Sequence, residues 1–289
     1  MIHIKKKTIL IADSGATKAD WCLVQGKQIV RRFSGKGISP IFQSKEEMEY
    51  EIRDNVLPQL VATTINAVYF YGAGCIPDKI PLVTGILSAA FPAAKIQVNS
   101  DLTGVAHALC GREAGIACIL GTGSNSCEWD GTKPTHQIPS LGFILGDEGS
   151  GAALGKHLLN KALKHQLTGG LKEALFEEYN LTVAVIIDRV YRQPFPSRFL
   201  ASLSPFIFKH RNDPSIRGLL HQCFDDFFEK NVMHYNYQEN KVHIVGSIGW
   251  YYADVLKEVA EEKGIQVGKI AKSPIEGLID YIATSPGTD

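Results

Sequence analysis

Three apolar segments of this 289-residue chain each run directly into a turn rich in glycine or hydroxyl residues. Short β-branched runs that end in such turns are typical of buried strands. A glycine turn after a strand exposes consecutive backbone N–H groups, which can bind phosphate oxygens. One such turn is explained by chain reversal alone, but three together favour a nucleotide-phosphate site. The three junctions are residues 8–12 with 13–18, 116–120 with 121–124, and 242–245 with 246–249.

The predicted elements follow one order twice. Three strands up to residue 33 precede a helix over 44–61, where Ser44 and Glu47 have the spacing of a capping box. Two further strands then alternate with two helices. A second strand pair follows, joined by the hairpin signal Asp130-Gly131. After it we predict helices over 148–167 and through most of 169–238, then a strand, a helix over 250–263, a last strand and a helix from Pro274. Two meanders, each followed by helices, indicate a duplicated α/β architecture with a cleft between its halves.

Composition excludes several classes of protein. Thirty basic and thirty acidic residues balance, so nucleic acid is not an expected partner. No apolar run approaches the ~20 residues needed to cross a membrane. The six cysteines form no CxxC pair and are read as reduced thiols, which predicts a cytoplasmic protein. Neither a P-loop nor a complete GxGxxG is present.

The turn sequences themselves carry a resemblance. Residues 13–18 (DSGATK), 121–124 (GTGS) and 245–249 (VGSIG) resemble the two phosphate motifs and the adenosine motif of the sugar kinase, Hsp70 and actin superfamily. Within it, residues 99–101 (NSD), 120–125 (LGTGSN) and 142–150 (GFILGDEGS) are similar to the N-acetylglucosamine kinases, and also fit the wider group of BadF/BadG-type activator ATPases. The similarity extends from about residue 8 to residue 284.

The resemblance implies two ribonuclease H-like domains around a cleft that holds ATP and Mg²⁺. Domain I would comprise residues 1–107 with the C-terminal helix, about 271–289, and domain II residues 108–270. The implied activity is transfer of the γ-phosphoryl group to a hexosamine, N-acetylglucosamine at its 6-hydroxyl being the leading candidate. A small-molecule sugar is the expected partner, and a homodimer stays open.

The resemblance also implies roles for individual residues. Asp101, which by its position could equally cap a helix, would be the general base that accepts the proton of the sugar hydroxyl. Asp13 would hold Mg²⁺ through water. ATP would be bound by Gly15, Ala16, Thr17, Lys18, Gly121, Thr122, Gly123, Gly246, Ser247 and Gly249, and the sugar by Ser39, Ser124, Asn125, Gly142, Phe143 and Asp147.

One position departs from the family pattern. The loop after the third strand reads Gly37-Ile38-Ser39-Pro40, where the family brings an asparagine to the sugar. Serine offers one hydroxyl where asparagine offers an acceptor and two donors. This departure bears on the identity of the sugar more than on phosphoryl transfer. Two alternatives to a kinase also stay open: an activator ATPase with an iron–sulfur cluster between subunits, for which Cys110 and Cys118 would be the ligands to test, and a non-catalytic sugar sensor.

Overall fold

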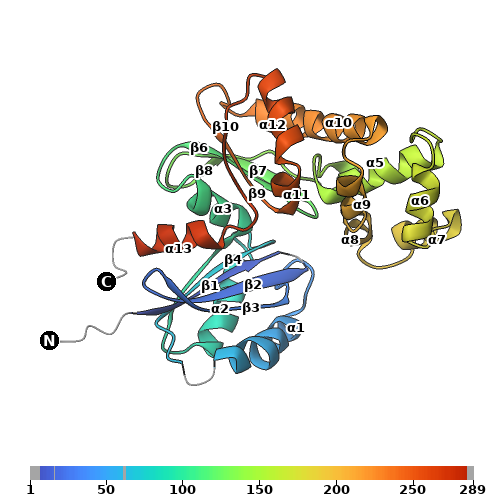
Figure 1. Cartoon of the computed structure of the whole chain (residues 1–289). Coiled ribbons are helices and arrows are strands. Elements are labelled where there is room, and N and C mark those ends of the chain that lie inside the picture. Colours follow the sequence, from blue (N-terminus) through green and yellow to red (C-terminus); the bar gives the residue numbers. More distant parts are fainter. Residues whose placement is uncertain (1–6, 16, 61–62, 285–289) are drawn as a thin grey trace. The chain divides into compact units, whose positions relative to one another are not determined.

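The computed structural model describes residues 7–15, 17–60 and 63–284. The chain divides into two compact units, Met1–Arg112 with Pro274–Asp289 (unit 1) and Glu113–Ser273 (unit 2). Each unit is built on a five-stranded mixed sheet with helices (Figure 1). The predicted α/β class with two such domains is confirmed.

The sheet of unit 1 has the order β3-β2-β1-β4-β5. Its first three strands form the predicted antiparallel meander, and β4 and β5 run parallel to β1. The carboxyl ends of β1, β4 and β5 therefore lie at one edge of the sheet, where Ser14 pairs with Gly72 and Gly72 with Ser100. The strands are β1 (Thr8–Ser14), β2 (Lys18–Gln25), β3 (Gln28–Lys36), β4 (Ala67–Gly72) and β5 (Lys95–Ser100).

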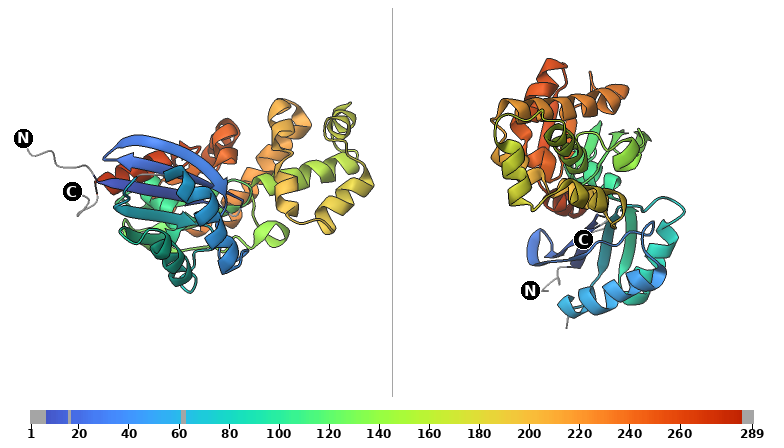
Figure 2. Two further views of the ribbon diagram at one scale, coloured as in Figure 1. Left: turned by 90° about the horizontal axis from the view of Figure 1, so that it is seen from below. Right: turned by 90° about the vertical axis from the view of Figure 1, so that its right-hand side faces the viewer.

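The two faces of this sheet are covered by different helices because side chains alternate along each strand. Leu10 and Ala12 belong to a core with residues of α1 (Lys45–Tyr50), the π-helix η1 (Glu51–Val56) and α2 (Ile80–Ala90). On the other face, α13 (Ile275–Ala283) packs against α3 (Asp101–Leu109), and both contact β1 (Figure 2). The C-terminal helix thus closes unit 1, although it is more than 160 residues from α3 in sequence. The 3₁₀ turn η2 (Leu57–Leu60) ends the first helical segment.

The sheet of unit 2 has the order β10-β9-β6-β7-β8. Strands β6 and β7 form an antiparallel pair, while β9 and β10 run parallel to β6 and to each other. The predicted turn at Asp130 and Gly131 connects β7 to β8, with the Asp130 carboxylate accepting from the Thr132 and Lys133 amides. The strands are β6 (Gly115–Leu120), β7 (Ser124–Trp129), β8 (Pro134–His136), β9 (Val242–Val245) and β10 (Val267–Ala271).

The core of unit 2 lies between its sheet and its helices. Leu120 and Ile244 from the sheet join buried residues of the long helix α10 (Pro214–Lys230), among them Phe224 and Phe227. Helices α6 and α7, yellow in Figure 1, lie at the end of unit 2 away from its sheet. The remaining helices are α4 (Gly142–Leu145), α5 (Gly151–Leu163), α6 (Leu171–Glu178), α7 (Val183–Tyr191), α8 (Pro196–Ala201), α9 (Ser204–Lys209), the 3₁₀ turn η3 (Val232–His234), α11 (Ser247–Tyr251) and α12 (Ala253–Glu262).

Two helix predictions need correction. The helix expected from Glu148 begins at Gly151, because Ser150 is its N-cap and accepts from the Ala153 amide. Glu148 therefore lies in the loop before this helix. The helix expected over 250–263 is two helices, α11 and α12, which meet at Tyr252.

Candidate active site

The turn after β1 is closed by a hydrogen bond from the Gly15 amide to the Lys18 carbonyl, at 2.9 Å. Asp13 precedes this turn, opposite Asp20 of β2 and beside Tyr71 of β4. Thr17 is half-buried, and the exposed Lys18 forms an ion pair with Asp20, 2.8 Å between Nζ and Oδ1. Ala16, the remaining predicted phosphate contact of this turn, lies outside the described residues. The turn therefore places a carboxylate and a hydroxyl residue at the carboxyl end of the central strand.

Asp13 and Asp101 lie at the same edge of the unit 1 sheet. Burial raises the pKa of Asp13 to about 7, and the nearby carboxylates of Asp101 and Asp20 add to the rise. Burial also raises the pKa of Asp101, which its hydrogen bond from the Leu102 amide partly offsets. Burial destabilises a charged carboxylate, and a bound proton or a nearby cation relieves this. Asp13 and Asp101 are therefore suited to accepting a proton or a cation.

Asp101 does not cap α3, contrary to the structural role considered from the sequence. The N-cap is Ser100, whose hydroxyl accepts from the Thr103 amide at 3.1 Å. Asp101 is the first residue of the helix, and its Oδ1 accepts from the Leu102 amide at 2.8 Å. One oxygen is thus fixed by the helix terminus, and the side chain is oriented without being the cap.

Ser39 follows β3 in a loop that is tied to the turn after β1. The Ser39 amide donates to Oε1 of Gln43 at 2.8 Å. Its side chain is buried, yet its hydroxyl has no hydrogen-bond partner in the described part of the chain. A methyl group on Gly74, which has a φ of +79°, would stand 2.9 Å from this hydroxyl. An unpartnered buried hydroxyl is costly, so it marks a position where a ligand could supply the missing hydrogen bond.

The second turn, in unit 2, is held by the helix that follows it. The Gly121 amide donates to the Gly123 carbonyl at 3.0 Å, and the carbonyls of Gly121 and Thr122 accept from the first amides of α5, Gly151 and Ala152, at 2.8 and 3.0 Å. Thr122 is exposed at the tip of the turn. These bonds fix the turn rigidly at the carboxyl end of β6.

Asp147 is the buried acid next to this turn. Its Oδ1 accepts from the Ser124 amide at 3.0 Å, and its own amide donates to the Ser140 carbonyl at 2.9 Å. Burial raises its pKa, and the Ser124 hydrogen bond opposes that rise. Its backbone has a φ of +57°, a left-handed conformation that is uncommon outside glycine. Local strain held in this way is typical of functional sites.

The neighbouring predicted sugar contacts lie around Asp147. Ser124 is buried, and Oδ1 of Asn125 accepts from the Ser126 amide and from Gln137, at 3.0 and 3.1 Å. Gly142, with a φ of +73°, begins the four-residue helix α4. The carbonyl of Phe143 in α4 accepts from Nζ of Lys156 at 3.0 Å.

In the third glycine segment, residues 246–249, close packing against β6 and β9 explains why Gly246 and Gly249 are glycines. A methyl group on Gly246 would stand 2.2 Å from the Leu120 carbonyl oxygen, and one on Gly249 would stand 2.5 Å from Ile244. Gly246 also has a φ of +120°. Ser247, the first residue of α11, is exposed, whereas Gly249 is buried. The close approach brings Gly246 directly against the end of β6.

The donor set is compatible with Mg²⁺. Mg²⁺ is usually bound by one or two carboxylates together with substrate phosphates and water, so Asp13 alone supplies what the chain must contribute. No group of three or more His, Cys, Asp or Glu side chains able to hold a metal occurs among the described residues. All six cysteines, Cys110 and Cys118 among them, are buried, and no disulfide joins any of them among the described residues.

Two residues that support the site had not been anticipated. Ser14 bonds to the loop that carries Ser39, and Ser100 caps the helix that carries Asp101. A serine directly before a helix is a signal that the sequence does contain, and it would have identified Ser100. The partner of Ser14 is 24 residues away, and no local pattern indicates it.

No helix in the described part of the chain is long and apolar enough to cross a membrane.

Comparison with solved structures gives matches over nearly the whole chain. A proposed N-acetylglucosamine kinase from Porphyromonas gingivalis is 46% identical, with a TM-score of 0.94 and coverage of 96% of this chain and 99% of that one. A second proposed N-acetylglucosamine kinase, from Chromobacterium violaceum, is 19% identical with a TM-score of 0.75, covering 96% and 99%. A ROK-family glucokinase from Streptomyces griseus, solved with glucose and AMPPNP, is 14% identical with a TM-score of 0.59, covering 94% and 97%. No protein-family model and no curated protein matches the chain.

The two sheets with their glycine turns, together with the match to the Porphyromonas structure, place the chain among the carbohydrate kinases of the actin-like ATPase fold. At 46% identity over 96% of its length, the chain belongs to the N-acetylglucosamine kinase-like family of these ATP-dependent sugar kinases.

Proposed function

We propose that this protein transfers the γ-phosphoryl group of ATP to N-acetylglucosamine at its 6-hydroxyl, with Mg²⁺ as the metal. One observation carries the choice of sugar. The Porphyromonas relative, itself a proposed N-acetylglucosamine kinase, is 46% identical over nearly the full length of both chains. The site residues support the same activity. Carboxylates and hydroxyl residues lie at the carboxyl ends of the strands, and such groups can hold Mg²⁺, phosphate and the hydroxyl of a sugar.

In this proposal Asp101 is the general base. Its fixed Oδ1 leaves Oδ2 to accept the proton of the 6-hydroxyl as that oxygen attacks the γ-phosphorus. The raised pKa of Asp101 favours proton acceptance, because an efficient general base has a pKa close to the working pH. Positioning supplies most of the remaining rate enhancement in phosphoryl transfer.

The ATP contacts of the proposal come from the three glycine segments. Asp13 would hold the magnesium ion through water, and the ion supplies charge neutralisation for the phosphates. Thr17 would donate its hydroxyl to a phosphate oxygen, as would Thr122. Lys18 reaches phosphate only if it leaves its ion pair with Asp20, an exposed pair that costs little to break. The backbone of Gly15, Ala16, Gly121, Gly123, Gly246, Ser247 and Gly249 completes the proposed set.

The proposed sugar contacts are polar groups of the site. Asp147 would accept hydrogen bonds from sugar hydroxyls, and Ser124 with Asn125 would bind the acetamide. Ser39 would use its unpartnered hydroxyl on the same sugar. Backbone groups of Gly142 and Phe143 complete the proposed set. Six buried cysteines without a disulfide among the described residues fit a reducing compartment, and we place the enzyme in the cytoplasm.

The test measures ADP release with a panel of sugars. We expect the highest kcat/KM with N-acetylglucosamine, a lower value with glucosamine and N-acetylmuramic acid, and the lowest with glucose. Mass spectrometry of the product, with the 6-deoxy sugar as control, identifies the hydroxyl. Equal rates with and without every sugar would refute kinase activity, and a preference for another sugar would refute the assignment of substrate.

A further inference from the structure

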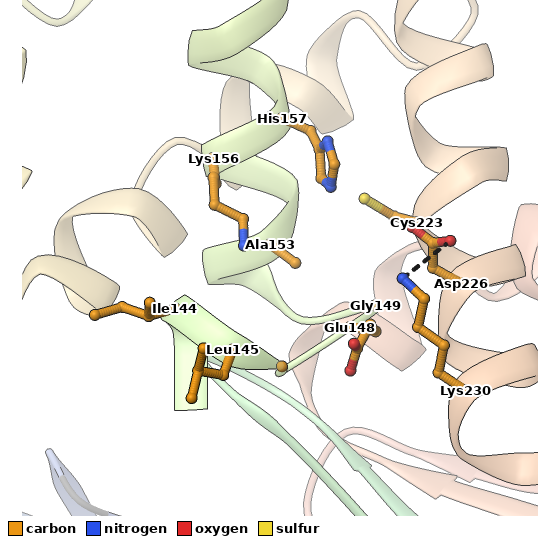
Figure 3. A pocket seen from close by; sticks show the side chains of 11 residues that line it. Ile144, Leu145, Glu148, Gly149, Ala153, Lys156, His157, Cys223, Asp226 and Lys230 are labelled. Carbon is orange, nitrogen blue, oxygen red and sulfur yellow. Dashed lines mark ion pairs between the residues drawn. The ribbon is translucent and has the colours of Figure 1, made fainter. Parts of the chain in front are cut away.

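Unit 2 contains a cavity of about 270 Å³ behind the loop that carries Asp147 (Figure 3). Its walls come from four segments: the end of helix α4, the loop with Glu148 and Gly149, helix α5 with Lys156 and His157, and helix α10. Helix α10 contributes Cys223, Asp226 and Lys230. The volume is slightly below the ~300–1,000 Å³ of typical ligand pockets, so only a small molecule would fit. None of the proposed catalytic or sugar-binding side chains lines it.

The acidic groups of this cavity already have partners. Asp226 forms an ion pair with Lys230, 3.4 Å between Oδ1 and Nζ, and Glu148 accepts from the Asn231 amide group at 3.4 Å. Neither ring nitrogen of His157 is hydrogen-bonded to another described residue, and the ring points toward Cys223 across the cavity (Figure 3). The ammonium groups of Lys156 and Lys230 each have one such partner, the Phe143 carbonyl and Asp226, and each keeps two further N–H donors, as the imidazole keeps its one.

The electrostatic surroundings of His157 are positive. Its pKa is lowered by burial first and then by the charge of Lys156; Asp226 opposes this shift, and the charges of Lys161 and Lys230 lower the pKa further. Three cations and one anion thus act on one neutral ring. A positive potential at a site with free N–H donors favours an anion.

We propose that this cavity is a binding site for a small phosphate-bearing anion, held by the ammonium groups of Lys156 and Lys230 and by the imidazole of His157. The three groups come from two helices, so they surround the ligand instead of contacting it from one side. Phosphate oxygens accept such charge-assisted hydrogen bonds well. The anion could be inorganic phosphate or the phosphoryl group of a sugar phosphate.

Occupancy of this cavity would be transmitted to the sugar loop, an effect that rests on the proposed function. Lys156 donates to the Phe143 carbonyl, and Glu148 and Gly149 directly follow Asp147. An anion that draws Lys156 toward the cavity weakens its bond to Phe143. Sugar affinity and anion affinity must then change by the same factor, and we expect the anion to raise the KM for the sugar severalfold.

The test uses the pKa of His157, because this readout needs neither sugar nor ATP. The imidazole carbon signal is followed by NMR between pH 4 and pH 8 with and without sulfate, whose charge is constant over this range, and is assigned with His157→Gln. We expect saturating sulfate to raise the pKa of His157 by at least one unit. A shift of one unit means that sulfate binds the protonated ring tenfold more tightly.

Charge variants of opposite sign keep the test specific. Lys230→Gln should weaken sulfate binding about tenfold and Asp226→Asn should tighten it, while Lys164→Gln, an exposed lysine of the same region, should change nothing. None of the three residues belongs to the proposed catalytic or sugar site. Repeating the titration with inorganic phosphate and with N-acetylglucosamine 6-phosphate separates the two sources of the anion. A pKa of His157 that no anion moves, or equal sulfate affinity in all variants, would overturn the proposal, and unchanged sugar KM alone would overturn only the coupling.

Discussion

Ser14 and Ile38 exchange two hydrogen bonds: the Ser14 hydroxyl accepts from the Ile38 amide at 2.8 Å and donates to the Ile38 carbonyl at 3.1 Å. Ser14 is completely buried at the end of β1. The pair fixes the loop after β3 against the turn that follows Asp13, although β2 and β3 separate the two segments in sequence. Ser39 is the next residue, so its unpartnered hydroxyl is held in place by this pair.

Replacement of Ser39 by alanine tests whether that hydroxyl serves a ligand. We expect Ser39→Ala to leave the free energy of unfolding unchanged or to raise it by up to about 1 kcal/mol, because a buried hydroxyl without a partner is removed. The KM for the sugar should rise about tenfold, as for the loss of one hydrogen bond. Chemical denaturation and steady-state kinetics give the two numbers. Ser14→Ala is the matched control and should lower stability by about 1–3 kcal/mol, since it leaves the Ile38 amide unpaired.

Replacement of Asp101 by asparagine tests the general base. Ser100 caps α3, so Asp101→Asn should not change the melting temperature. Sugar-dependent turnover should fall by roughly 10²- to 10⁴-fold, the usual contribution of general base catalysis, while affinity for an ATP analogue stays the same. Ser100→Ala separates the two roles, because it should cost about 1 kcal/mol of stability. Wild-type turnover in folded Asp101→Asn protein would exclude Asp101 as the base.

Gly123 lies against the Asp147 carboxylate, and Gly121 two residues earlier does not. A methyl group on Gly123 would stand 3.0–3.2 Å from the carboxylate atoms, whereas one on Gly121 would have no described atom within 4 Å apart from its chain neighbours. Gly123→Ala should therefore displace Asp147 and raise the KM for the sugar about tenfold, with a smaller change in the KM for ATP. Gly121→Ala should fold normally and alter the KM for ATP if that residue faces the phosphates. The prediction fails if the two variants raise the sugar KM equally.

Features that depend on residues close together in the chain could be predicted from the sequence. The strands of the three junctions and the Ser44–Glu47 capping box were predicted because their signals span only a few residues, and the structure confirms them. The third turn, expected over 246–249, is instead the start of helix α11, which begins at Ser247. The capping box needs only residues three apart, and both of its hydrogen bonds are present.

The remaining features depend on contacts between distant residues. The positive φ of Asp147 follows from its bonds to Ser124 and Ser140, and the break between α11 and α12 occurs at Tyr252, whose hydroxyl donates to the Ser204 carbonyl. The unpartnered hydroxyl of Ser39 is also a property of the folded chain alone. Local patterns identify which residues carry the chemistry, and long-range packing decides how each of them is held.

The half-buried His107 should make the protein sensitive to acid. It lies in α3 with its Nδ1 3.1 Å from the Tyr71 hydroxyl and its ring stacked on Tyr281 of α13, and burial lowers its pKa to about 4 from an ordinary value near 6.5. Between these pH values the unfolded chain binds a proton that the folded chain does not. The free energy of unfolding should therefore fall as the pH decreases from 6.5 to 4, by up to about 1.4 kcal/mol per pH unit from this residue.

Urea denaturation at intervals from pH 8 to pH 4 measures this slope. His107→Gln should be less stable than the wild type at pH 8, because the contacts with Tyr71 and Tyr281 change, but its stability should depend less steeply on pH below 6.5. His234→Gln, which replaces an exposed histidine, should keep the wild-type slope. Burial also lowers the pKa of His243 to about 4, so part of the slope should persist in His107→Gln. Identical slopes in wild type and His107→Gln would show that His107 is protonated equally in the folded and unfolded states, which would contradict the lowered pKa of its half-buried ring.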